Sequence, residues 1–180
     1  MKRKPLRTAC WRRVGQVARQ RGSHLRHRDW RLTIAGADDR SPGTAASLRA
    51  QIAVSGLDTR IAVTGAVDDA TLAGLYREAD LFVMPSLFEG YGMVLAEAMA
   101  RGLPIVCTTG GAAADTAPDT TALKVPPGNV AALVEALDLV LTDAARRHAM
   151  ANAAWSASQQ LPGWNDTARV IAQVLKKVAT

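Results

Sequence analysis

Two glutamates that flank a glycine-containing loop carry the clearest chemical signal in this sequence. Glu89 and Glu97 have seven residues between them, and Gly90 and Gly92 follow the first glutamate. Glycine lets a backbone turn tightly and approach a ligand without a Cβ atom in the way. A carboxylate accepts hydrogen bonds from sugar or ribose hydroxyls, and free amides at a helix start bind phosphate. This combination favours a nucleotide-sugar site, although a solvent-facing Glu97 on an ordinary helix fits the same residues.

The elements that hold this loop can be predicted from its flanks. The apolar run 80–84 predicts a buried strand, and Pro85 with Ser86 ends it, because proline supplies no ladder donor and serine favours turns. Residues 93–101 are good helix formers, so we expect a helix from about Gly92. Glu97 interrupts the apolar residues of that helix, and its carboxylate needs a partner because an unpaired buried charge costs several kcal/mol.

The rest of the chain alternates between strand and helix patterns. Apolar runs predict strands at 32–36, 60–65, 105–107 and 123–125. Helical spacing predicts helices at 44–54, 68–79, 130–141, 144–160 and 166–179, with Asp68 or Asp69 and Asn129 as N-terminal caps. In the last helix, Val170, Val174 and Val178 predict a packed face. This alternation indicates an α/β fold: a doubly wound parallel sheet flanked by helices.

Composition limits the class of protein. A chain of 180 residues is one ordinary domain, and 48% hydrophobic residues with few aromatics are typical of a folded α/β protein. Cys10 and Cys107 have no metal-site spacing, so we interpret both as thiols in a reducing cytosol and predict a cytoplasmic location with no metal. No apolar run reaches the roughly 18 residues of a membrane span, and no secretory signal is present.

The net charge of +6 comes from one end of the chain. Residues 1–31 hold eleven Lys or Arg and one acidic residue, Asp29, whereas the remainder carries a net −4. For the globular part we predict no nucleic-acid partner, since no basic stripe spreads over the predicted fold. For the basic segment 1–29, three interpretations remain: a solvated arm, a helix at the inner membrane face, or a contact with nucleic acid. The pair His24 and His27 lacks the further ligands of a metal site.

Several motifs in order resemble one enzyme family. They are Pro85-Ser86-Leu87-Phe88, the Glu89 to Glu97 spacing, the run from Ala98 to Val106, Gly110-Gly111 and Val125-Pro126-Pro127-Gly128-Asn129. Residues 30–180 thereby resemble the donor-binding C-terminal domain of retaining glycosyltransferases with the two-domain GT-B fold, the family 4 or group 1 type. The resemblance implies glycosyl transfer from a nucleotide sugar, such as a UDP- or GDP-sugar, with retained configuration and without a cofactor or obligatory metal.

The resemblance also implies roles for individual residues. Those assigned to the donor sugar are Glu89, Gly90 and Tyr91. Glu97 is assigned to the ribose. The residues assigned to the diphosphate are Ser86, Gly92, Met93 and Val94, together with the Tyr91 amide. Gly65 and Val67 are assigned to the base side, and Gly110 with Gly111 to a donor loop.

The sequence departs from the family at its start. Family members open this domain with an apolar strand, a Gly-Arg-Leu-like turn and a Lys-Gly, and residues 1–29 show none of these. We therefore expect no strand there and interpret the start as divergent, truncated or frame-shifted. The N-terminal acceptor domain also has no room in 180 residues. We expect weak or no transfer by this chain alone; the alternative is a non-catalytic nucleotide-binding or interaction module that retains the fold.

Overall fold

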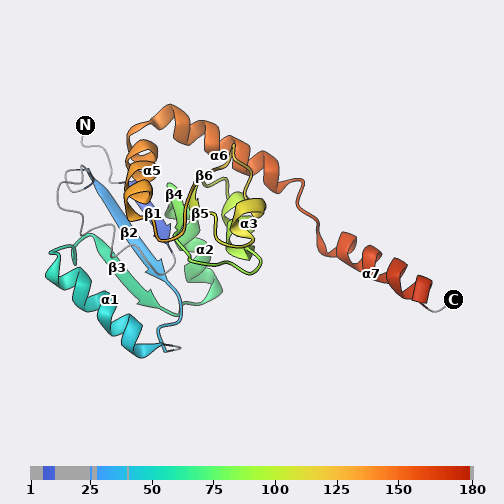
Figure 1. Ribbon diagram of the computed structural model, residues 1–180, viewed down its shortest axis with the longest axis horizontal. Helices are drawn as coiled ribbons and strands as arrows, with labels where there is room; N and C mark the ends of the chain where they lie inside the picture. Colours follow the sequence, from blue (N-terminus) through green and yellow to red (C-terminus); the bar gives the residue numbers. More distant parts are fainter. Residues whose placement is uncertain (1–5, 11–24, 26–27, 40, 179–180) are drawn as a thin grey trace.

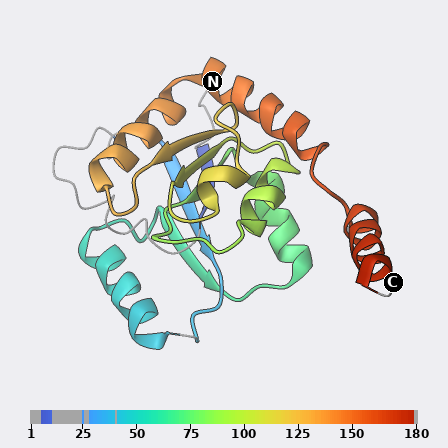
Figure 2. The same ribbon diagram turned by 45° about the vertical axis from the view of Figure 1, so that its right-hand side comes forward.

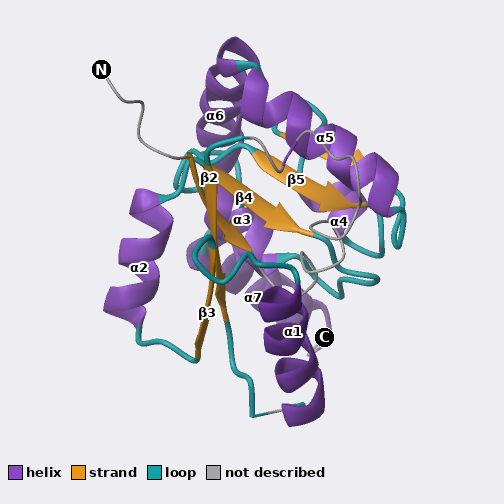
Figure 3. Cartoon of the chain, turned by 90° about the vertical axis from the view of Figure 1, so that its left-hand side faces the viewer, coloured by secondary structure: helices purple, strands orange, loops and turns teal. Residues whose placement is uncertain are grey.

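One parallel sheet flanked by helices forms the domain, which confirms the predicted doubly wound α/β fold (Figures 1 and 3). The computed structural model describes residues 6–10, 25, 28–39 and 41–178. The strands are β1 (Leu6–Cys10), β2 (Trp30–Ala35), β3 (Ile61–Gly65), β4 (Leu81–Met84), β5 (Ile105–Thr108) and β6 (Ala122–Val125). They pair in the order β3-β2-β1-β4-β5-β6, with every pair parallel.

The helices agree with the predicted positions to within a few residues, with one addition. They are α1 (Pro42–Val54), α2 (Asp69–Glu78), α3 (Met93–Met99), α4 (Ala113–Thr116), α5 (Val130–Thr142), α6 (Ala144–Ser158) and α7 (Trp164–Val178). The predicted caps are confirmed: the Asp68 side chain accepts from the Thr71 amide at 2.8 Å, and Asn129 from the Ala132 amide at 3.0 Å. The additional helix, α4, follows the predicted donor-loop glycines Gly110 and Gly111.

Helices cover the sheet on both faces and create two cores. All residues of β4 and β5 are buried, because their alternating side chains meet helices on either side. On one face Leu81 and Val83 pack with Ile52 of α1 and Leu137 of α5. On the other face, the second core contains residues of α2 and α3 together with Phe82 of β4. The central strands therefore form a rigid support for the loops at their ends.

Strand β1 corrects an expectation from the sequence. No strand was expected in residues 1–29, but Leu6–Cys10 pairs with β2 on one side and with β4 on the other. The sequence Leu-Arg-Thr-Ala-Cys lacks an apolar run, and pairing with two neighbouring strands supplies the order that composition does not indicate. Most of the basic segment 1–29, including His24 and His27, lies outside the described residues, so the interpretations of that segment stay predictions.

Helix α7 differs from expectation in its packing. Residues 165–178 are all exposed, including Val170, Val174 and Val178 of the predicted packed face. Figures 1 and 2 show α7 projecting away from the sheet and its flanking helices. The described part of this chain does not cover the apolar face of α7. Within the described ranges, no helix is both long and apolar enough to cross a membrane.

Burial on α5 gives a direct test of the core. We expect Leu137→Ala to lower the free energy of unfolding by about 2–5 kcal/mol, because Leu137 is 6% exposed and the substitution leaves a cavity. Leu139→Ala, on the same helix but 40% exposed, is the matched control and should cost less than about 1 kcal/mol. Urea unfolding followed by circular dichroism measures both values; equal losses would contradict the described core.

Candidate functional site

The predicted motif lies at the point where the strand order reverses. Because all strands are parallel, their carboxyl ends share one edge of the sheet, and β1 and β4 are neighbours with connections that run to opposite sides. Ligands of open α/β sheets bind in the crevice outside this position. The loop after β4 starts with the buried Pro85 and leads through Glu89 into α3. The topology therefore places the motif where a doubly wound fold binds its ligand.

Glu89 is held through its backbone by the loop after β5. Its amide donates to the Gly110 carbonyl at 3.0 Å, and its carbonyl accepts from the Ala112 amide at 2.9 Å. Two glycines permit this approach: a Cβ on Gly110 would lie 2.3 Å from the Leu87 carbonyl oxygen, and one on Gly111 would lie 2.3 Å from that of Glu89. The two predicted glycines thus lie directly beside the motif and are paired with it.

The Glu89 carboxylate turns back onto the start of α3. Its Oε1 accepts from the Gly92 amide at 3.1 Å and more weakly from the Tyr91 amide at 3.4 Å. Two of the four amides predicted to face a diphosphate therefore already have a carboxylate partner. The hydrogen bonds found among the described residues include none donated by the amides of Met93 and Val94. These two amides follow Gly92, which caps α3 with a φ of +85°.

Thr116 contacts the motif loop, a contact that the sequence did not reveal. Its hydroxyl lies 3.0 Å from the Tyr91 carbonyl oxygen and 2.8 Å from that of Ala112. A Cβ on Gly92 would approach the Thr116 Oγ1 to 2.8 Å, so the loop and α4 are in close contact. The run Ala113-Ala114-Asp115 has neither a cap nor an apolar stripe to indicate that a helical turn presents this hydroxyl.

Glu97 has a protein partner on a neighbouring helix. Its Oε2 accepts from the Tyr76 hydroxyl of α2 at 3.1 Å, and the Arg101 guanidinium lies 4.3 Å from the centre of the Tyr76 ring. Burial raises the pKa of Tyr76 above its ordinary value, and the Glu97 charge raises it further. The expectation that this carboxylate needs a partner is confirmed, and the partner in the structure is a phenol.

The remaining predicted residues divide between two places. Ser86 lies beside Glu89, and its carbonyl accepts from the Thr108 hydroxyl of β5. Gly65 ends β3, and Val67 follows it, at the same carboxyl edge of the sheet. Strands β2 and β1 separate β3 from β4, which corresponds to about 14 Å at 4.8 Å per strand. The fold therefore groups residues 86–94, 110 and 111 and leaves the base-side pair farther along the edge.

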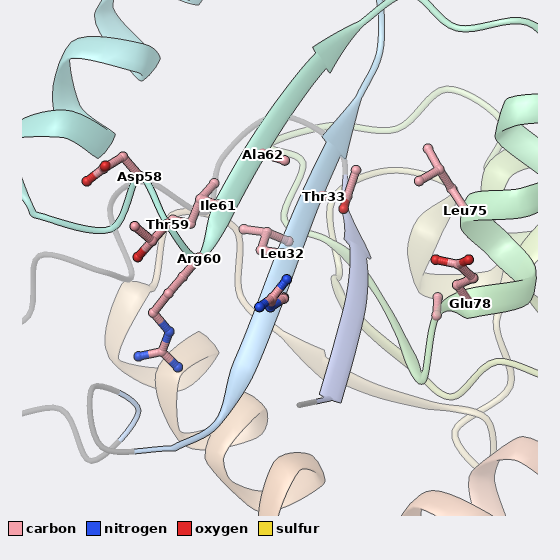
Figure 4. A pocket seen from close by; sticks show the side chains of 11 residues that line it. Leu32, Thr33, Asp58, Thr59, Arg60, Ile61, Ala62, Leu75 and Glu78 are labelled. Atoms are coloured by element: carbon pink, nitrogen blue, oxygen red, sulfur yellow. The ribbon is translucent and has the colours of Figure 1, made fainter. Parts of the chain in front are cut away.

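A separate cavity lies at the other edge of the sheet. It has a volume of about 350 Å³ and is bordered by the first residues of β2 and β3 and by the end of α2, as Figure 4 shows. Thr33 and Ala62 face it, as do Leu75 and Glu78 from the helix. This cavity shares no residue with the motif. Among the described residues, no cluster of three His, Cys, Asp or Glu side chains is placed to hold a metal ion.

Backbone crowding at the loop pairing can be tested. Gly111→Ala should lower the free energy of unfolding by about 1–3 kcal/mol, because Gly111 has a φ of +66° and its new Cβ would collide with the Glu89 carbonyl oxygen. Gly74→Ala in α2, with open space around the added atom, should be neutral or stabilising by up to about 1 kcal/mol. Chemical unfolding of both variants gives the comparison, and an unaffected Gly111→Ala would argue against the described pairing.

Known relatives share this sequence and fold. The family described as "Glycosyl transferases group 1" matches residues 11–143. A D-inositol 3-phosphate glycosyltransferase from Xylanimonas cellulosilytica is 32% identical over 145 residues, which cover 80% of this chain and 34% of that protein. A phosphatidyl-myo-inositol mannosyltransferase from Mycobacterium leprae is 34% identical over 154 residues, covering 84% of this chain and 39% of the relative.

Solved structures agree on the fold. A glycosyltransferase from Rickettsia africae superposes with a TM-score of 0.84 at 21% identity, covering 100% of this chain and 49% of that one. Anabaena Alr3699/HepE in complex with UDP superposes with a TM-score of 0.81 at 21% identity, covering 97% and 49%. The chain spans about a third of the first of these sequence relatives and about half of each solved structure. By sequence over most of its length, this chain belongs to the glycosyl transferases group 1 family, with the fold of a GT-B glycosyltransferase domain.

Proposed function

We propose that this chain is the donor-binding domain of a glycosyltransferase and binds a nucleotide-diphosphate sugar for transfer with retained configuration. The observation that carries the proposal is the arrangement around Gly92. A glutamate, two amides without a partner among the described hydrogen bonds and a short helix follow β4 at the strand-order reversal. Support comes from the Anabaena neighbour, whose structures contain UDP or UDP-glucose.

Each group in the site has a role in this proposal. The Met93 and Val94 amides bind the diphosphate and stabilise the negative charge that grows as the nucleotide departs. One Glu89 oxygen holds the loop amides, and the other accepts hydroxyls of the donor sugar beside Gly90. Glu97 binds the ribose hydroxyls. Ser86 completes the phosphate side, Gly65 and Val67 lie towards the base, and Gly110 with Gly111 forms the wall beside the sugar.

The proposal includes a second domain that carries the acceptor. The site is open on one side: Phe88 is 75% exposed, Tyr91 74% and Met93 61%. The chain spans about half of the Rickettsia and Anabaena proteins. A partner domain would cover the exposed side chains and exclude water from the reacting sugar. The apolar face of α7 offers that domain a further contact.

Binding of nucleoside diphosphates tests whether the chain binds the nucleotide part of the donor. Calorimetric titration of the chain with UDP and with GDP should show one of them binding. Glu97→Gln should weaken that binding about tenfold or more, because a hydrogen bond to a charged group contributes about 1.5–3 kcal/mol. Glu135→Gln, an exposed glutamate on α5, is the charge-matched control and should bind as the unmodified chain does. No binding of either nucleotide would contradict the proposal.

Transfer by the chain alone tests the need for a second domain. With a radiolabelled nucleotide sugar and simple acceptors, we expect turnover far below the roughly 10 per second of a typical enzyme, because half of the reaction cleft is open to water. Turnover at an ordinary enzyme rate would show that no further domain is required. Nucleotide binding that never supports transfer, even with an added acceptor domain, would instead favour a non-catalytic module.

A further inference from the structure

We propose that Tyr76 is a positioning residue that orients Glu97 towards the nucleotide, an inference that rests on the proposed role of Glu97 at the ribose. Tyr76 belongs to α2, 21 residues before Glu97, and its hydroxyl donates to Glu97 Oε2 at 3.1 Å. Tyr76 lies outside the motifs that this chain shares with the resembling family. The structure therefore adds a second helix to the candidate site.

The two helices have a geometry that suits this role. Helix α2 starts after the carboxyl end of β3, and α3 starts after the loop at the carboxyl end of β4, so both run away from the ligand edge. Side chains in helices lean back towards the helix N-terminus. Tyr76 and Glu97 therefore both lean towards the edge of the sheet where the motif lies. Their hydrogen bond connects α2 with α3 beneath that edge.

The Tyr76 ring is fixed on several sides, so its hydroxyl has a defined position. The residue is 5% exposed, and its ring stacks on Phe82 with 5.9 Å between centroids and 27° between planes. The Arg101 guanidinium lies over the same ring, and its Nη1 donates to the Glu97 carbonyl at 3.0 Å. The ordinary pKa of a tyrosine hydroxyl, about 10, already keeps it protonated in neutral solution, and burial raises the Tyr76 pKa further, so the phenol remains a donor.

The hydrogen bond leaves one side of the carboxylate for a ligand. Oε2 is engaged by Tyr76, and the bonds found among the described residues include none to Oε1. A free glutamate side chain loses rotamer freedom when it binds, and a side chain already held in place loses less. Anchoring by Tyr76 would thus strengthen binding to a ribose diol without any contact between Tyr76 and the nucleotide.

The test uses Tyr76→Phe, which removes the hydroxyl and retains the ring that stacks on Phe82. Calorimetry on the full chain measures the dissociation constants of UDP and of 2′,3′-dideoxy-UDP, or of the guanosine pair if only GDP binds. We expect the unmodified chain to prefer UDP about tenfold or more. Tyr76→Phe should weaken the binding of UDP about three- to tenfold and leave the affinity for the dideoxy nucleotide unchanged. In the Glu97→Gln background, Tyr76→Phe should cause no further loss.

A control variant and a check of folding separate a loss of positioning from a loss of stability. Thr142→Val removes a hydroxyl that bonds within α5, at 2.7 Å from the Asp138 carbonyl, and should change neither affinity. Thermal unfolding without nucleotide establishes that each variant is folded. If Tyr76→Phe unfolds near the assay temperature, all titrations are repeated at a lower temperature at which every variant is folded.

The results distinguish this inference from the proposed function. If Glu97→Gln weakens UDP binding but Tyr76→Phe does not, the positioning role of Tyr76 is overturned and the proposed donor site stands. If Tyr76→Phe lowers the affinity for both nucleotides equally, the effect is a general structural one, and the positioning role is overturned as well. If Glu97→Gln leaves UDP binding unchanged, the ribose role of Glu97 fails and the inference fails with it.

Discussion

The candidate site depends on the backbone pairing between the loop after β4 and the loop after β5. Glu89 exchanges hydrogen bonds with Gly110 and Ala112, and both loops follow strands whose residues are fully buried. A Cβ atom on either loop glycine would collide with the backbone of the loop after β4. The position of the Glu89 carboxylate relative to the start of α3 thus comes from two rigid strands and two small residues, whereas α3 itself is only seven residues long.

Polar groups at the site form hydrogen bonds with one another. Glu89 accepts from two amides of its own loop, and Glu97 accepts from Tyr76. Such bonds limit the cost of keeping carboxylates partly buried and keep them near the geometry that a ligand requires. In the proposed function, a nucleotide sugar would meet a largely preformed arrangement with the Met93 and Val94 amides still available.

Exposed apolar side chains mark where the second domain of the proposed enzyme would make contact. Exposed apolar side chains lie around the loop and along α7, and the chain spans about half of the solved glycosyltransferases that it matches. Exposed apolar side chains that lie close together favour contact with another domain. The cavity at the amino edge of β2 and β3 is bordered by charged, polar and apolar side chains and shares no residue with the motif.

The sequence by itself determined the fold class, most elements and the motif, because these follow from local patterns: apolar runs, helix caps such as Asp68 and Asn129, and residues close in the chain. Tertiary structure decided what long-range contacts control. Strand β1 exists through pairing with β2 and β4, Thr116 and Tyr76 reach the site from separate segments, and the apolar face of α7 stays exposed. A single sequence shows which residues are apolar or polar, but only the folded chain shows which of them meet.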